Sequence, residues 1–284
     1  MTERVLFADI GNTIVKWRLW DSDGWADSCW AELCEAPDKV RDSLLAWRPS
    51  ALAVVASVSA GAVSEVHSVR SCVAGRDAAM QGMVSVLAVA AEFVELAEEA
   101  RVPLFLAGRD FPIPIPTEYR DPTEMGLDRL CSAFAARQLF GAPVVTASAG
   151  TCLTVEAVDA RGVVVGGAIA AGVSAMAKGL GEAVPHLRPF LEDALRSDVA
   201  ALELGRSTAE NLALGLWMGA AAALDRLVAM ARAAVGQEAP VVLTGGDAAA
   251  FARLCRSEVK VCERLVLEGL RLAYENRFGR GPRE

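Results

Sequence analysis

Residues 6–16 constrain the fold more strongly than any other stretch of this sequence. An apolar run of strand length covers residues 5–8, and the strand pattern resumes a few positions after a carboxylate at Asp9. Gly11 and Asn12 lie between the two runs, and both residue types tolerate positive φ. The stretch therefore predicts a β-hairpin with a tight turn, although ordinary hairpins with polar turns show the same pattern.

The tip of this predicted hairpin carries groups that suit a phosphate and its metal ion. Backbone N–H groups of the turn can face an anion, Thr13 adds a hydroxyl, and the Asp9 carboxylate can hold Mg²⁺ directly or through water. We therefore treat the tip as a candidate phosphate site.

Residues 144–156 repeat this design, with a strand, small residues, a Gly150-Thr151 turn and a second strand. Near the end of the chain, residues 241–247 form another apolar strand pattern that runs into Gly245 and Gly246 and then a helix. Two such hairpins with a late glycine pair resemble the layout of the sugar kinase, Hsp70 and actin superfamily. The resemblance implies an α/β fold of two related ribonuclease-H-like (actin-like ATPase) domains with a nucleotide cleft between them.

Composition excludes several classes of function. The chain has 284 residues, of which 53% are hydrophobic and 23% charged, as in soluble globular proteins. A net charge of −8 argues against a nucleic-acid surface. The seven cysteines are scattered and no signal peptide is visible, so we expect a cytoplasmic protein with reduced thiols. No apolar run is both long and uniform enough to predict a membrane span.

A proline-dense segment at residues 111–122 cannot be regular helix and is either a linker or a rigid pocket wall. We expect one domain over residues 1–122, with the first hairpin, and another over 123–284, with the second hairpin and the dimer helices. A continuous apolar run predicts a buried parallel strand over residues 51–58, and Ser57 and Ser59 at its end could line the cleft. Helical patterns cover residues 37–47, 125–140, 209–233, 248–255 and 265–278.

Eight motifs in a fixed order resemble the type III pantothenate kinases, and together they cover nearly the whole chain. They are Asp9-Ile10-Gly11-Asn12-Thr13, Tyr119, Gly126-Leu127-Asp128-Arg129, Gly150-Thr151, Gly166-Gly167-Ala168-Ile169, Gly205-Arg206-Ser207-Thr208, Thr244-Gly245-Gly246-Asp247 and Leu267-Glu268-Gly269-Leu270. Each motif alone is weak, whereas the ordered set is specific. The resemblance implies a homodimeric kinase that phosphorylates pantothenate to 4'-phosphopantothenate with ATP and Mg²⁺, the first step of coenzyme A biosynthesis. Many members of that family also need a monovalent cation, K⁺ or NH₄⁺.

The resemblance implies a role for each matching residue. Asp128 corresponds to the proton acceptor, and Asp9 lies on the Mg²⁺ side of the phosphates. Residues expected at ATP are Asp9, Ile10, Gly11, Asn12, Thr13, Ile14, Val15, Lys16, Thr151, Gly245 and Gly246. Residues expected at pantothenate are Tyr119, Gly126, Leu127, Asp128, Arg129 and Thr208, the last of these across the dimer.

The chemistry of Asp128 and Arg129 is compatible with these roles. Phosphoryl transfer depends mainly on positioning and charge neutralisation. Asp128 lies at a predicted helix start, which favours an ionised carboxylate, and Arg129 can bind the pantothenate carboxylate as a bidentate fork. In isolation, the same two residues would also fit a solvated pair at a helix terminus.

One position departs from the family pattern. Ser148 stands where the resemblance predicts an aspartate that is associated with the monovalent cation. Serine keeps an oxygen but lacks the charge, so three alternatives stay open: activity without a tightly bound cation, weak activity, or loss of activity. The last would make the protein a non-catalytic relative with a binding or regulatory role. A kinase of the same superfamily acting on another small hydroxyl compound is a further alternative.

Overall fold

The computed structural model describes residues 4–59, 62 and 81–279, and the chain divides into two compact units. The first unit contains the described residues up to Ile115, then Tyr119–Ala135 and the chain from Leu265 onwards. The second contains Pro116–Glu118 and Ala136–Arg264. The predicted division into residues 1–122 and 123–284 stays a prediction. The compact units differ from it because the last helix returns to the first unit.

The first unit is built on a five-stranded sheet with the strand order β3-β2-β1-β4-β5. Strand β1 is antiparallel to β2 and parallel to β4, and β4 is parallel to β5. The strands are β1 (Val5–Ile10), β2 (Ile14–Asp21), β3 (Gly24–Glu32), β4 (Ala51–Ala56) and β5 (Leu104–Leu106). The predicted first hairpin is confirmed, with Asp9 directly opposite Lys16.

The second unit contains a five-stranded sheet with the order β10-β9-β6-β7-β8. Strand β6 is antiparallel to β7 and parallel to β9, as β1 is to β2 and β4. The strands are β6 (Val144–Ala149), β7 (Cys152–Val158), β8 (Val164–Ala171), β9 (Val241–Thr244) and β10 (Lys260–Val261). Both sheets therefore share one topology, and the α/β fold of two related units is confirmed.

The shared topology makes Asp9 and Ser148 equivalent positions. Each is the fifth residue of a six-residue strand that is the middle strand of its sheet. Each strand also leads into the tight turn of its hairpin. The weak sequence repeat between the two hairpins thus reflects a repeat in structure.

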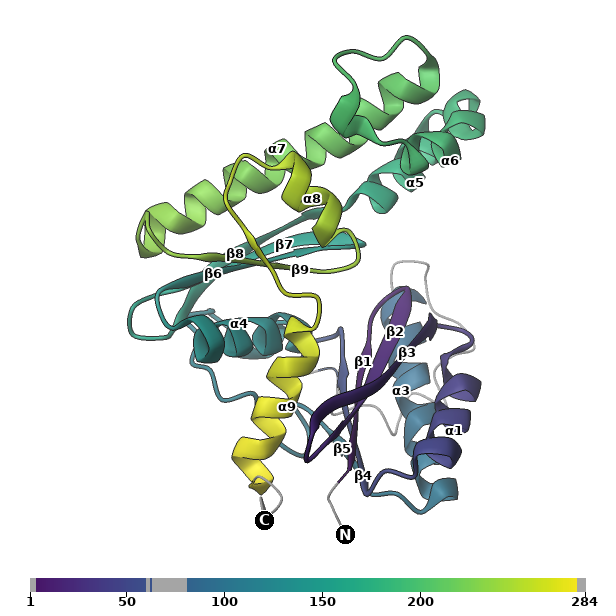
Figure 1. Ribbon diagram of the computed structural model, residues 1–284, viewed down its shortest axis with the longest axis vertical. Coiled ribbons are helices and arrows are strands. Elements are labelled where there is room, and N and C mark those ends of the chain that lie inside the picture. Colours follow the sequence, from purple (N-terminus) through teal and green to yellow (C-terminus); the bar gives the residue numbers. More distant parts are fainter. Residues whose placement is uncertain (1–3, 60–61, 63–80, 280–284) are drawn as a thin grey trace. The chain divides into compact units, whose positions relative to one another are not determined.

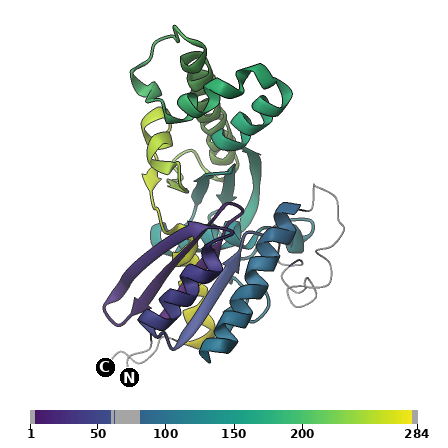
Figure 2. The same cartoon turned by 90° about the vertical axis from the view of Figure 1, so that its right-hand side faces the viewer.

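Helices cover both faces of the first sheet. The Trp17 indole nitrogen donates a 2.9 Å hydrogen bond to Ser43 of α1, whereas the Phe7 ring on the other face packs edge-on against Tyr274 of α9. Helices α1 and α3 lie side by side, as Figure 2 shows. The helices of this unit are α1 (Ala36–Trp47), α3 (Gln81–Ala100), η3 (Pro122–Glu124), α9 (Leu265–Phe278) and the start of α4 (Leu127–Phe140).

In the second unit, the long helix α7 packs along the sheet (Figure 1). Its buried positions, such as Leu216, Leu224 and Val228, form one stripe over β6 and β7. Helix α7 is long and apolar enough to cross a membrane by length and composition, although its sequence does not predict a span. Its buried stripe instead packs in a core shared with β6 and β7. The other helices are α5 (Val173–Ala183), η4 (Pro185–Leu187), α6 (Arg188–Arg196), η5 (Val199–Ala201) and α8 (Ala248–Leu254).

The first hairpin turn differs from its prediction in one respect. Neither Gly11 nor Asn12 is among the described residues with positive φ. Glycine fits position 11 for another reason, because a Cβ there would lie 2.7 Å from the Ile14 carbonyl oxygen, which accepts the Gly11 N–H. The turn therefore needs close backbone approach and not a left-handed conformation.

Candidate active site

Asp9 lies near the end of β1, between β2 and β4, where its backbone is held on both sides. Its Oδ1 atom is buried and has no hydrogen-bond partner in the described part of the chain. Burial, reinforced by the nearby Asp128 carboxylate, raises the pKa of Asp9 from its usual 3.8 to about 7, although Lys16 opposes the shift. The ionised form of Asp9 is therefore disfavoured, and an added positive charge would stabilise it.

Asp128 is the second residue of α4, as the sequence predicts. The Leu127 N–H donates to the Val58 carbonyl at 3.1 Å, and Gly126 forms a β-bridge with Ser59. These contacts join the start of α4 to the chain that leaves β4. The Ser57 hydroxyl donates to Asp128 Oδ2 at 3.1 Å, so the predicted position of Ser57 at the end of the strand brings it to the catalytic candidate.

Burial raises the pKa of Asp128, and hydrogen bonds from Ser57 and the Arg129 N–H lower it only in part. The helix start by itself favours the ionised form of the carboxylate and would lower this pKa. Desolvation outweighs the helix terminus here, because most of the carboxylate's surroundings are protein. A carboxylate with a raised pKa is a stronger base once it is ionised.

The structure brings Asp9 and Asp128 together in the first unit. Burial raises the pKa of the Cys131 thiol of α4 well above its usual 9.0, and the Asp9 and Asp128 carboxylates add to the rise, so both lie near this side chain. Asp128 also raises the pKa of Asp9 directly. The two acids, one from β1 and one from α4, therefore share one local environment.

This environment fits a hard divalent cation. The buried, unpartnered Asp9 Oδ1 is an oxygen donor of the kind Mg²⁺ prefers, and a second carboxylate lies close by. No group of three or more His, Cys, Asp or Glu side chains able to hold a metal occurs among the residues with described coordinates. Mg²⁺ usually takes one or two carboxylates and completes its shell with water and phosphate oxygens, so the Asp9 carboxylate is sufficient as its protein ligand.

Arg129 and Tyr119 form a second pair beside this environment. Arg129 Nη2 donates a 2.6 Å hydrogen bond to the Tyr119 hydroxyl, and the guanidinium carbon lies 5.7 Å from the ring centroid. Tyr119 lies near the end of the proline-dense segment, in which Phe111, Ile113 and Ile115 are buried. The first part of the segment is therefore packed through alternate residues, while its prolines at 112 and 116 are exposed.

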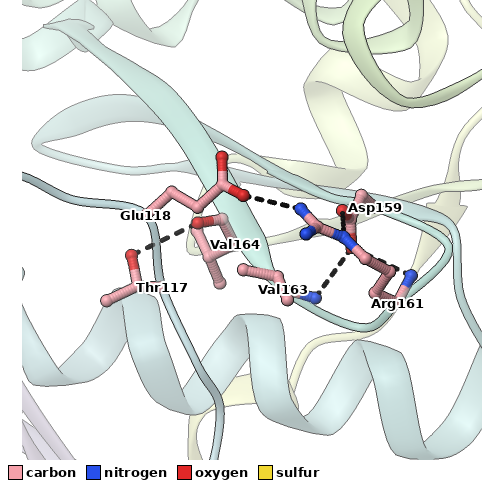
Figure 3. Close-up of polar contacts among 6 residues, drawn as sticks. All are labelled: Thr117, Glu118, Asp159, Arg161, Val163 and Val164. Carbon is pink, nitrogen blue, oxygen red and sulfur yellow. Dashed lines mark hydrogen bonds and ion pairs between the residues drawn. The ribbon is translucent and has the colours of Figure 1, made fainter.

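Residues just before Tyr119 attach to β8 in the second unit (Figure 3). The Glu118 N–H donates to the Val164 carbonyl at 2.9 Å, and the Thr117 hydroxyl approaches the same oxygen at 3.3 Å. Arg161 pairs with Glu118 and with Asp159, each at 2.6 Å. Sequence reasoning did not identify this network, because no local pattern links two segments that lie 43 residues apart.

Several predicted site residues lie in the second unit, and their roles stay predictions. Gly245 has a φ of +106°, and a Cβ there would lie 2.0 Å from the Ala149 carbonyl oxygen, so only glycine fits. Thr151 is exposed in the turn of the second hairpin, and Thr208 is the exposed first residue of α7. Ser148 is partly buried between Thr154 and Thr244 on the neighbouring strands.

Comparisons with known proteins agree with this geometry. The model of the type III pantothenate kinase family matches residues 5–230. A type III pantothenate kinase from Azoarcus sp. is 30% identical over 266 residues, which cover 94% of this chain and 89% of that protein. One from Thermomicrobium roseum is 37% identical over 188 residues, covering 65% and 70%.

Solved structures support the fold alone. The activator of the 2-hydroxyisocaproyl-CoA dehydratase from Clostridium difficile, with bound ADPNP, is 14% identical and superposes with a TM-score of 0.50 over 98% of this chain and 97% of that one. The matched family model spans both hairpins, Asp9, Asp128 and Arg129. The chain belongs to the type III pantothenate kinase family.

Proposed function

We propose that this protein transfers the γ-phosphoryl group of ATP to the primary hydroxyl of pantothenate. The products are 4'-phosphopantothenate and ADP, and the reaction is the first step of coenzyme A biosynthesis. Family membership supports the proposal, as do the names of the relatives. The observation that carries it is the coupled pair of carboxylates, Asp9 and Asp128, in one local environment.

Asp128 is the proposed general base. As the substrate oxygen bonds to the γ-phosphorus, the bond to the bridging oxygen of ADP breaks, and the hydroxyl proton passes to the Asp128 carboxylate. The direction of the Asp128 pKa shift supports this role, because raising the pKa of a carboxylate above its usual 3.8 makes it a stronger base. Bound Mg²⁺ would neutralise charge on the phosphates, and Asp9 would hold it.

Arg129 and Tyr119 are the proposed holders of the pantothenate carboxylate end. An arginine fork recognises a carboxylate through two parallel hydrogen bonds, and Tyr119 orients the guanidinium through the 2.6 Å contact. Gly126, Leu127 and a partner subunit's Thr208 complete the proposed substrate set.

The proposed ATP contacts come from both hairpins. They are Asp9, Ile10, Gly11, Asn12, Thr13, Ile14, Val15 and Lys16 in the first unit, and Thr151, Gly245 and Gly246 in the second. Ser148 marks the proposed position of a monovalent cation, K⁺ or NH₄⁺, with a neutral oxygen in place of a carboxylate. We further propose that the protein works in the cytoplasm as a homodimer.

A coupled assay of ADP release tests the proposal. We expect turnover that requires both ATP and pantothenate, measured with Na⁺ alone and with added K⁺ or NH₄⁺, and a phosphorylated product identified by mass spectrometry. Absence of pantothenate-dependent turnover under every cation would refute it. Calorimetry then separates the alternatives. Binding without turnover indicates a regulatory relative, and turnover with another alcohol from a substrate panel indicates a different kinase.

A further inference from the structure

We infer that Ser57 is a positioning residue for Asp128. Its hydroxyl holds one carboxylate oxygen, Oδ2, and so leaves Oδ1 to accept the substrate proton. The inference rests on the proposed kinase function and deepens it, because it names the side chain that orients the base.

The contact has the geometry and the chemistry of an orienting hydrogen bond. Ser57 Oγ donates to Asp128 Oδ2 at 3.1 Å, from a residue 71 positions away in the chain. A hydroxyl has a single proton to donate, and this bond uses it. The acceptor belongs to a partly buried carboxylate, and hydrogen bonds to charged acceptors are stronger than those between neutral groups.

The backbone around Ser57 keeps its hydroxyl in place. The Ser57 N–H donates to the Ile10 carbonyl at 2.9 Å, directly after Asp9 in β1. The next residue, Val58, accepts the Leu127 N–H, and the one after it, Ser59, bridges to Gly126. Three consecutive residues are thus fixed to the end of β1 or to the start of α4, and Ser57 connects the segments that carry the two acids.

Asp128 needs such a restraint because of its neighbour. The Asp9 carboxylate lies close by, and the Asp128 side chain has two torsions through which its own carboxylate could turn away from the substrate. The Ser57 hydroxyl opposes that rotation, whereas the Arg129 N–H acts only from the same helix turn. Loss of the hydroxyl should therefore weaken the chemical step more than the binding of pantothenate.

The test compares three substitutions at Ser57 in the full-length protein. We expect Ser57→Ala to lower kcat about 10- to 100-fold, the effect of losing one hydrogen bond to a charged group, with KM for pantothenate within about twofold. Ser57→Thr, which restores a hydroxyl, should recover most of kcat. Ser57→Cys, a weaker donor of similar size, should fall between the two.

Ser50→Ala is the matched control at the opposite end of β4. The Ser50 hydroxyl accepts from the Arg4 N–H at 3.1 Å and donates to the Arg4 carbonyl at 2.9 Å, so its removal also costs hydrogen bonds next to the strand. We expect its kcat to stay within about twofold of that of the unsubstituted protein, and thermal melts identify any variant that is unfolded at the assay temperature.

The outcomes separate this inference from the function on which it rests. If the unsubstituted protein shows no pantothenate-dependent turnover, the proposed function fails. If it turns over and Ser57→Ala keeps kcat within twofold, Ser57 has no positioning role and the inference alone is overturned. A loss shared equally by Ser57→Thr, or by Ser50→Ala, would indicate a structural effect and would also overturn it.

Discussion

Arg129 and Tyr119 are joined by a 2.6 Å hydrogen bond, in which the guanidinium donates to the phenol oxygen. The pair links the first turn of α4 to the end of the proline-dense segment. Tyr119→Phe removes the acceptor and leaves the ring in place, so the guanidinium loses this hydrogen bond while the local packing is retained.

We expect Tyr119→Phe to raise KM for pantothenate about tenfold with a small change in kcat, since one hydrogen bond to a charged group contributes about 1.5–3 kcal/mol. Steady-state kinetics with saturating ATP measures the effect. KM for ATP is the internal control and should not change. An equal rise in both KM values would show that the pair does not act on pantothenate specifically.

Asp128→Asn should abolish most turnover. An amide cannot accept the substrate proton, and general-base catalysis contributes about 10²- to 10⁴-fold, so kcat should fall by that factor. ATP binding by calorimetry should persist, because Asp128 is not a proposed nucleotide contact. Asp38→Asn is the control, an exposed aspartate of α1 that pairs with Arg41 at the surface. A kcat above one tenth of the original in Asp128→Asn would exclude Asp128 as the base.

Asp9 should make folding stability depend on pH in the absence of metal. Its pKa is about 7 in the folded protein and near 3.8 when unfolded, so between these values unfolding releases a proton. Stability from this group therefore falls as pH rises from about 4 to 7. The loss at pH 8 is about 4 kcal/mol at most, at about 1.4 kcal/mol per pKa unit.

Asp9→Asn removes that penalty. Its unfolding free energy should equal that of the unsubstituted protein below pH 4 and exceed it increasingly up to pH 8, as measured by urea denaturation with a chelator present. Asp42→Asn, at an exposed position on α1, should show no such trend. Mg²⁺ at pH 8 should stabilise the unsubstituted protein and not Asp9→Asn. A difference that shrinks as pH rises would contradict the assigned shift.

Arg271 of α9 should be a large contributor to the stability of the first unit. Its side chain is buried, pairs with Glu268 and with Glu275 at 2.7 Å, and stacks 4.2 Å from the centroid of the Trp20 ring. Arg271→Met leaves two nearby carboxylates without their cation, and we expect a loss of about 3–5 kcal/mol in unfolding free energy.

The matched control is Arg196→Met. Arg196 also pairs with a glutamate one helical turn away, at 2.8 Å, but both side chains are more than 70% exposed. Such a pair contributes about 0–1 kcal/mol. Chemical denaturation of both variants measures the difference, and similar losses in the two would show that burial of the Arg271 network has no special role.

Local patterns in the sequence predicted most elements correctly. Alternation and turn residues located both hairpins, and the 3.6-residue period located the helix at Leu265–Phe278. Long-range partners were not predictable in this way. The Trp25 indole donates to Glu268 at 2.8 Å across 243 residues, and no local pattern indicates that the last helix returns to the first sheet.

The candidate site shows the same limit. The end of a predicted parallel strand identified Ser57 as a candidate, and the hairpin tip identified Asp9. The family resemblance, and no local pattern, identified Asp128 as the base. The rise in the pKa of Asp128 was not predictable from its place at a helix start, since it depends on how much protein surrounds the carboxylate. The Arg161 network that fixes Glu118 was missed, because it depends on the register between β8 and a distant segment.

Ser148 gives the last prediction, through its equivalence to Asp9. It occupies the same strand position in the second sheet, next to Thr154 and Thr244, and it offers a neutral oxygen where the family resemblance predicts a carboxylate. Because the charge of the ligands sets the affinity of an oxygen site for a cation, we expect the unsubstituted protein to respond weakly to K⁺ or NH₄⁺.

Ser148→Asp should make the activity depend on K⁺ or NH₄⁺ and lower the half-activating cation concentration at least about tenfold, or about 1.4 kcal/mol. Ser148→Asn is the control, with the size of aspartate and no charge, and should behave like serine. Initial rates titrated with KCl against NaCl at constant ionic strength measure the effect. Strong K⁺ activation of the unsubstituted protein would show that a neutral oxygen at this strand position is enough.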